Sequence, residues 1–71
     1  MGNLDLIIII NNTSVFLILG TDYETRNGAI RQAIIKFEEN CKEIYKQADK
    51  PEEFESDWDE IKEIKVYEFN Q

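Results

Sequence analysis

The sequence predicts an α+β domain in which one long and one short helix pack on one face of a small, mainly antiparallel three-stranded sheet, in the order β-β-α-α-β. Two short apolar segments flank an asparagine-rich turn, residues 29–48 have apolar side chains at helical spacing, and a β-branched segment follows an acidic stretch that begins with a proline. At 71 residues the chain has room for one core, so residues 1–71 are expected to form a single domain.

The first expected element is a hairpin over residues 4–19. Residues 4–10 and 15–19 are rich in β-branched and aliphatic side chains, which favour strands. Asn11-Asn12-Thr13-Ser14 lies between them and is typical of a turn, because asparagine tolerates positive φ. Gly20 is expected to end the second strand. The first strand has the most isoleucine and is expected at the centre of the sheet.

Both strands of this hairpin are apolar on both faces, and continuous apolar strands imply cover on both sides. The helices of so short a chain can cover one face only. We expect the second face to bind another protein, to pair with a second copy of the chain, or to stay exposed or wrapped by the tail. The residues assigned to a possible homodimer interface are Ile7, Ile9, Phe16 and Ile18.

A long helix is expected over about residues 22–48. Thr21 and Glu24 have the spacing of a capping box, which would start the helix early. Gly28 opposes that start, since glycine inside a helix costs about 1 kcal/mol relative to alanine. We interpret the apolar stripe of this helix as the layer that packs on the sheet. Its members recur at spacings of four and three, widened by two neighbours: Ile30, Ile34, Phe37, Cys41, Ile44 and Ala48, with Ala33 and Tyr45.

Pro51 ends the long helix and suits the first turn of a short acidic helix, expected over residues 51–62. Glu52 and Glu53 are favourable at its positive end. Helical spacing places the apolar side chains on one face and most acids on an outward arc. The apolar set is Phe54, Trp58 and Ile61, and the arc holds Glu52, Glu53, Asp59, Glu60 and Glu63. A third strand is expected over residues 64–69.

Negative charge is concentrated in the last third of the chain. Residues 51–71 contain eight acids and two bases, a net charge of −6 out of −7 for the whole chain. The sequence pI of about 4.4 argues against direct binding of nucleic acid or of anionic membranes, and favours a basic protein partner. The alternative interpretation is a solvated helix face that serves solubility.

Catalytic and metal-binding chemistry is not expected. The chain has one cysteine and no histidine, which excludes an internal disulfide and a Cys/His zinc site. Cys41 lies on the apolar stripe without a neighbouring base, so we predict no enzyme activity and no cofactor. The apolar segments fall far below the ~20 residues of a membrane span, and no signal peptide is recognised. A cytoplasmic location is expected, in a bacterial cell or in a cell infected by a virus that encodes the chain.

A resemblance to a known family adds to this interpretation. The hairpin Leu6-Ile7-Ile8-Ile9-Ile10-Asn11-Asn12 with residues 15–19, the helix, and the stretch Pro51-Glu52-Glu53-Phe54-Glu55-Ser56-Asp57-Trp58 resemble, in their order over about residues 6–70, the small phage-borne anti-CRISPR proteins that inhibit Cas9. The resemblance implies carboxylates that occupy the site where Cas9 arginines bind the guanines of the PAM. A second likeness is to barstar-type immunity proteins, which are acidic inhibitors of basic nucleases.

The sequence therefore predicts a small acidic inhibitor that binds a basic nucleic-acid-binding protein, such as a nuclease or Cas effector, by steric and electrostatic blocking or partial DNA mimicry. One alternative is a homodimeric assembly protein that interacts through the apolar sheet face. Another is a small enzyme or ligand-binding protein, which would need a concave site. The residues predicted to bind the partner are Glu52, Glu53, Glu55, Asp57, Trp58, Asp59, Glu60 and Glu63.

Overall fold

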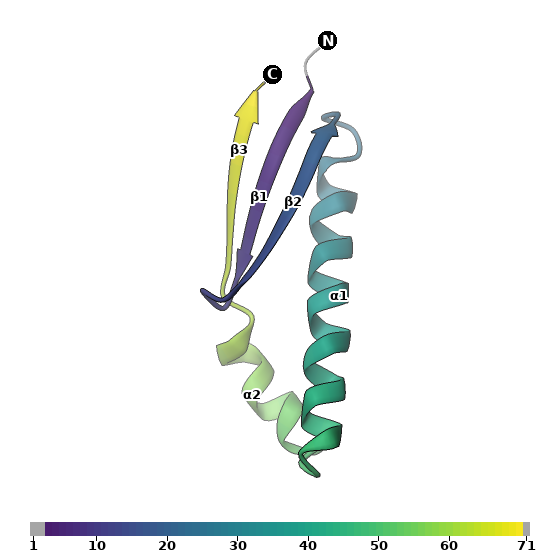
Figure 1. The fold of residues 1–71 in the computed structure, drawn as a ribbon, viewed down its shortest axis with the longest axis vertical. Helices are drawn as coiled ribbons and strands as arrows, with labels where there is room; N and C mark the ends of the chain where they lie inside the picture. The colour runs from purple at the N-terminus through teal and green to yellow at the C-terminus, as the bar shows by residue number, and fades with distance from the viewer. Residues whose placement is uncertain (1–2, 71) are drawn as a thin grey trace.

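The computed structural model describes residues 3–70 and confirms the α+β class and the order β-β-α-α-β. A three-stranded antiparallel sheet is formed by β1 (Leu4–Ile10), β2 (Ser14–Thr21) and β3 (Ile64–Asn70), and the two helices are α1 (Arg26–Gln47) and α2 (Glu53–Ile61) (Figure 1). The strand order is β2-β1-β3, so the isoleucine-rich strand is central, as expected. α1 runs alongside the sheet next to β2, and α2 lies beyond one end of the sheet (Figure 1).

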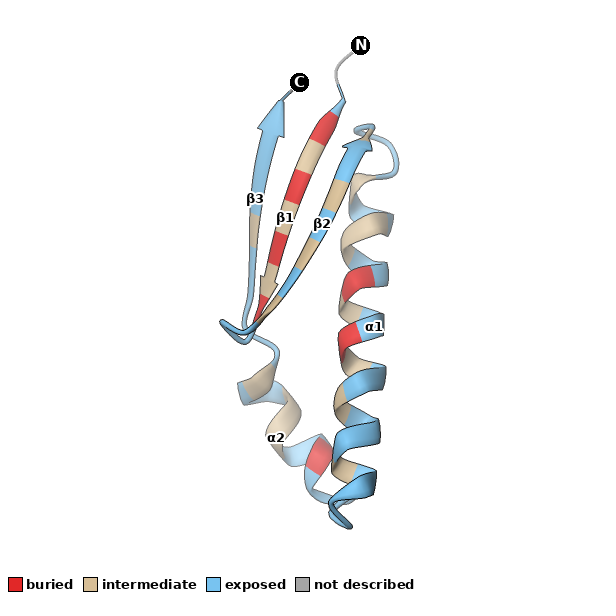
Figure 2. Ribbon diagram, viewed as in Figure 1, coloured by how far each residue is buried: buried red, intermediate tan, exposed pale blue. Residues whose placement is uncertain are grey.

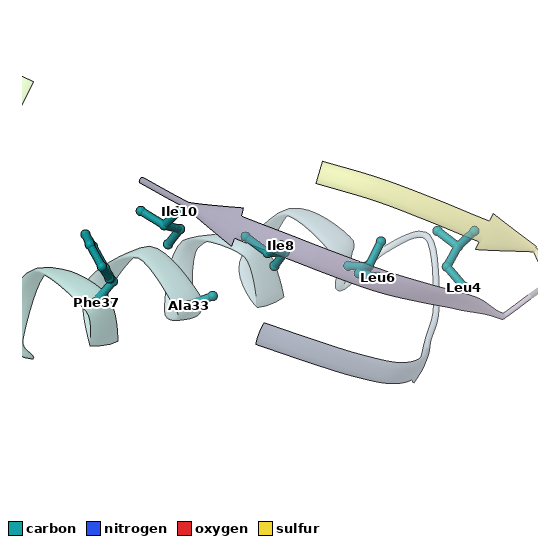
Figure 3. Packing of buried hydrophobic residues seen from close by; sticks show 6 residues of the cluster. All are labelled: Leu4, Leu6, Ile8, Ile10, Ala33 and Phe37. Atoms are coloured by element: carbon teal, nitrogen blue, oxygen red, sulfur yellow. The ribbon is translucent and has the colours of Figure 1, made fainter. Parts of the chain in front are cut away.

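The core is built on one face of β1, whose residues alternate between buried and half-buried along the whole strand (Figure 2). Its even-numbered side chains form one buried cluster with two residues of α1. Figure 3 shows Ala33 and Phe37 beside the part of β1 that holds Ile8 and Ile10, with Leu6 and Leu4 farther along the strand. Full burial of an aliphatic or aromatic side chain stabilises the fold by roughly 1.5–3 kcal/mol, so this cluster is the main source of stability. The cluster consists of Leu4, Leu6, Ile8, Ile10, Ala33 and Phe37.

The link between β1 and β2 has three residues, and its length decides which way each side chain of β2 faces. Ser14 already belongs to β2 and pairs with Ile10. In the link, Asn11 and Asn12 both have a φ of 55°, in the left-handed region that asparagine tolerates. A four-residue link would have paired Ile10 with Val15, and a slip of one residue moves every side chain of a strand to the other face.

This register corrects the group of residues assigned to the second face of the sheet. Phe16 pairs with Ile8, and both Phe16 and Ile18 pack against the core on the side of α1. Ile7 and Ile9 alternate with the buried positions of β1 and face the other way. The four residues predicted to form one surface are therefore divided between the two faces.

A β-bulge extends β2 beyond its predicted end at Leu19. The register shifts by one residue between the pairs Leu4–Thr21 and Leu6–Ile18. Gly20 sits in the bulge with a φ of 70°, which glycine adopts without strain. The backbone N–H of Gly20 donates to the Asp5 carboxylate at 3.0 Å, so a side chain of the central strand holds the bulge of the edge strand.

α1 begins at Arg26, four residues later than the predicted start. The capping box of Thr21 and Glu24 does not form the helix start; the Asp22 carboxylate instead accepts hydrogen bonds from the backbone N–H and the hydroxyl of Thr25, at 2.9 and 2.8 Å. These two bonds lower the pKa of Asp22, the backbone bond most strongly. Arg26 then forms an ion pair with Glu68 of β3, which connects the first turn of α1 to the far strand.

α1 is longer than the sheet, and its second half has a different environment from the first. A helix of 22 residues spans roughly 33 Å, whereas a strand of seven spans roughly 23 Å. Ile30, Ile34 and Cys41 pack against the core, as the stripe predicts. Ile44 is 62% exposed and Ala48 is also exposed, so the last part of the stripe does not pack on the sheet.

α1 ends in a Schellman motif, and α2 follows directly. Asp49 has a φ of 60°, its N–H donates to the Lys46 carbonyl, and the Lys50 N–H donates to the Tyr45 carbonyl at 2.9 Å. This geometry usually uses glycine, so the sequence pattern did not indicate it. Pro51 lies in the following turn rather than inside a helix, and α2 starts at Glu53, two residues after the predicted boundary.

Candidate functional site

α2 is attached to α1 by a chain of aromatic side chains. Phe54 is 5% exposed and contacts Tyr45 edge-on, with ring centroids 5.7 Å apart. Its other neighbour is Trp58, stacked at 5.3 Å, and Trp58 in turn lies 6.0 Å from Phe37 in the core. Trp58 is half-buried and directed toward the core. The predicted apolar face of the acidic helix is therefore the face that holds α2 in place.

A hydrogen bond adds a polar contact to this aromatic packing. The Tyr45 hydroxyl donates to the Asp57 carboxylate at 2.9 Å. This bond raises the pKa of Tyr45, helped by partial desolvation and by the negative charge of Asp57. Asp57 is half-buried, unlike most acids of α2. Of the eight residues predicted to bind a partner, Asp57 and Trp58 thus have structural contacts within the fold.

The other six predicted residues form what we call the acidic face. All are exposed, on the outward side of α2 or in the segments that flank it. Two of them have local counter-charges: Lys62 lies 3.0 Å from Asp59, and Lys65 lies 3.8 Å from Glu63. Exposed ion pairs of this kind contribute about 0–1 kcal/mol. The acidic face consists of Glu52, Glu53, Glu55, Asp59, Glu60 and Glu63.

The preference of a helix N-terminus for negative charge explains only some of the acidic residues in the acidic face. Glu53 and Glu55 lie in the first turn of α2, where negative charge is favourable. Asp59 and Glu60 lie near the opposite end, where the helix dipole disfavours acids, and the last turn contains no basic residue. The helix dipole therefore does not account for Asp59 and Glu60, and only Asp59 has a counter-charge there, in Lys62 at the C-cap.

A second candidate surface is the side of the sheet opposite α1, which we call the outer sheet face. Val15 and Leu17 are 61% and 65% exposed, and Ile7 and Ile9 beside them are half-buried. The antiparallel register adds two exposed aromatic residues of β3, opposite Ile7 and Asp5. A three-residue link between β1 and β2, had it been predicted instead of a four-residue link, would have assigned Val15 and Leu17 to this face. The outer sheet face consists of Ile7, Ile9, Val15, Leu17, Tyr67 and Phe69.

A hollow of about 510 Å³ lies between β2 and α1 and is lined mainly by apolar side chains, among them Phe16, Ile18 and Ile35. It contains neither the acidic face nor the thiol of Cys41. Burial raises the pKa of Cys41, which keeps the thiol protonated and poorly nucleophilic. The hollow therefore has no side-chain arrangement typical of nucleophilic catalysis.

Residues 3–70 contain no cluster of three or more histidine, cysteine or acidic side chains placed to hold a metal ion. In the same range, no helix combines the length and the hydropathy that crossing a membrane requires. Comparisons of the chain with protein-family models, with curated proteins and with solved structures found no match.

Proposed function

We propose that this chain is a non-catalytic binding protein, a small acidic inhibitor whose acidic face binds a basic nucleic-acid-binding protein or nuclease. One observation carries the proposal: α2 and its two flanking segments display six exposed carboxylates, four of them on the helix, and the opposite side of α2 is fixed to α1 through Phe54 and Trp58. The Asp57–Tyr45 hydrogen bond holds the same helix from a third position. The charge is therefore displayed from an ordered frame.

An ordered surface loses less conformational entropy on binding than a mobile segment does, because its backbone and side chains are already fixed. A mobile acidic tail would lose conformational freedom on binding, at about 0.5–1.5 kcal/mol for each long side chain and more for the backbone. α2 loses little backbone freedom, because Phe54 is already packed in the free protein. Concentrated negative charge also accelerates association with a basic partner.

The dimensions of α2 suit a groove that normally holds a phosphate backbone. A nine-residue helix is roughly 13 Å long, and double-stranded DNA presents one charge per ~1.7 Å of its axis. The carboxylates are sparser than phosphates, so the expected action is partial mimicry combined with steric blocking. Cas effectors and basic ribonucleases, the targets that the resemblances imply, both have such basic grooves.

The test is binding of the purified chain to a panel of Cas9–guide RNA complexes and basic ribonucleases, measured by biolayer interferometry at low and high salt. We expect at least one of them to bind, with an affinity that falls as salt rises. The triple substitution Glu53→Lys, Asp59→Lys and Glu60→Lys should weaken that binding by about tenfold or more, because it replaces attraction by repulsion.

The matched control reverses three acids outside the acidic face: Glu24→Lys, Glu39→Lys and Glu43→Lys. It changes the net charge by the same amount and leaves α2 untouched. If both triple variants weaken binding equally, the interaction depends on net charge and the proposed site is wrong. Absence of binding to every member of the panel would refute the inhibitor proposal itself. Circular dichroism confirms that each variant keeps its fold.

A further inference from the structure

We infer that two copies of this chain associate through their outer sheet faces, as a two-fold dimer in which the β1 strands are antiparallel across the interface. The association does not depend on the partner proposed for the acidic face; the charge of α2 enters only in the choice of orientation. The resulting dimer has four layers in the order helix, sheet, sheet, helix, and each outer layer is the α1 helix of one copy. The occupant of the outer sheet face is a second copy, for reasons of area, charge and symmetry.

The area of the outer sheet face suits a weak but specific dimer. Leu17 and Val15 are both more than half exposed, and Tyr67 and Phe69 extend the same surface across β3. The face presents on the order of 500 Å² per copy, so a dimer would bury about 1,000 Å² in total, the lower bound for a biological interface. The largest apolar patch on a typical soluble monomer measures about 300–600 Å² and is often functional, and the outer sheet face lies in that range.

The charged residues that share this side of the sheet are complementary under a two-fold rotation. Asp5 lies near the start of β1, and Lys65 pairs with Ile9 near its end, so the two charges are roughly 13 Å apart along the strand. A two-fold axis perpendicular to the strands places Asp5 of one copy over Ile9 of the other, next to Lys65. Within the chain, Asp5 accepts the Gly20 N–H, and Lys65 donates to Asn12 and lies 3.8 Å from Glu63. A carboxylate and an ammonium group can each take part in several hydrogen bonds at once.

The acidic helix selects between the two possible axes. α2 lies beyond one end of the sheet (Figure 1), and residues 51–63 contain seven acids and one lysine. An axis parallel to the strands would bring the two copies of α2 together, and their like charges would repel. The perpendicular axis places them at opposite ends of the dimer. The preferred dimer therefore has antiparallel β1 strands and an acidic face at each end.

Sedimentation velocity over the micromolar range tests the association. We expect the wild-type chain to shift with concentration from 8.4 kDa toward twice that mass. Leu17→Lys places a charge in the middle of the outer sheet face and should weaken association at least tenfold. Because Leu17 is exposed in the single chain, the substitution should leave the fold intact, which circular dichroism verifies. A wild-type chain that stays monomeric at the highest concentration overturns the inference.

The matched control is Ile35→Lys on α1, in the apolar hollow beside β2. This position would matter if copies paired through the free edge of β2, and it lies away from the outer sheet face. Ile35→Lys should dimerise like the wild type. If it dissociates the dimer while Leu17→Lys does not, the outer sheet face is the wrong surface.

Cross-linking tests the orientation. The perpendicular axis passes through the row of Leu17, Ile7 and Tyr67, so each Leu17 faces its own counterpart. In a Cys41→Ser background, Leu17→Cys should be joined efficiently between copies by a short bismaleimide. Val15→Cys is two residues from the axis and should react poorly. Equal cross-linking at the two positions, or none at Leu17→Cys in a dimeric sample, would contradict the antiparallel arrangement.

Discussion

Removing the ring of Phe54 should release α2 from α1. Phe54 is 5% exposed and contacts both Tyr45 and Trp58. Truncating a buried phenylalanine to alanine costs about 3–5 kcal/mol, and the lower end applies because one helix alone covers this site. A chain of 71 residues has a total stability of roughly 4–10 kcal/mol. Phe54→Ala should therefore remove about 3 kcal/mol, a third or more of the total.

Urea unfolding measures this loss, and the chain provides its own probe. Trp58 is the only tryptophan and lies on α2, so its fluorescence reports whether that helix is docked. With a denaturant slope of about 1 kcal/mol per molar urea for so small a domain, the midpoint should fall by about 3 M. Circular dichroism at the same concentrations follows the sheet and α1. We expect Trp58 to become exposed at lower urea than the rest of the variant unfolds.

The control for this variant is Ile44→Ala, which truncates a side chain that is 62% exposed on α1. Substitutions at exposed positions usually change stability by less than about 0.5 kcal/mol. A loss of less than about 1 kcal/mol for Phe54→Ala, or a similar loss for both variants, would show that aromatic packing does not hold α2. The acidic face would then not be displayed from an ordered helix.

Two other predictions concern stability. Gly28→Ala should stabilise the protein by about 0.5–1 kcal/mol, because Gly28 lies inside α1 with open space around it. Gly20→Ala should destabilise the protein by about 1 kcal/mol, because Gly20 has a φ of 70°. Urea unfolding that gives both changes in stability the same sign contradicts this reasoning. Because Asp57 raises the pKa of Tyr45 above its ordinary 10.0, stability should decline above about pH 10, where the unfolded chain loses that proton first. Tyr45→Phe should make this alkaline decline shallower, and an unchanged slope refutes the link.

Local sequence signals predicted the class, the element order and the central strand. The same signals could not predict which face of β2 joins the core, because both sets of its side chains are apolar. That choice depends on whether Ser14 belongs to the turn or to the strand. Two adjacent asparagines with positive φ close the turn in three residues, and one residue of difference exchanges Phe16 for Val15 on the core side.

Tertiary dimensions, rather than periodicity, decided how much of the apolar stripe of α1 packs on the sheet. The apolar stripe of α1 continues to Ile44, yet the sheet it covers is shorter than the helix. Only the aromatic residues of α2 cover the remaining part, and they leave Ile44 exposed. Asp49 ends α1 in the conformation usually taken by glycine, so the helix end lacked its commonest sequence marker.

In α2, the charge of a residue and its position on the helix gave different predictions of which acids face solvent. Periodicity correctly separated Phe54 and Trp58 from the outward acids, because that separation is a property of any helix packed on one side. Periodicity also left Asp57 out of the outward arc that contains Asp59, but charge alone placed both residues among those predicted to bind the partner. Asp57 accepts the Tyr45 hydroxyl, whereas Asp59 pairs with Lys62 in solvent. Reversing Asp57 would test the fold as much as the interaction, so the charge-reversal experiment depends on Asp59 and leaves Asp57 unchanged.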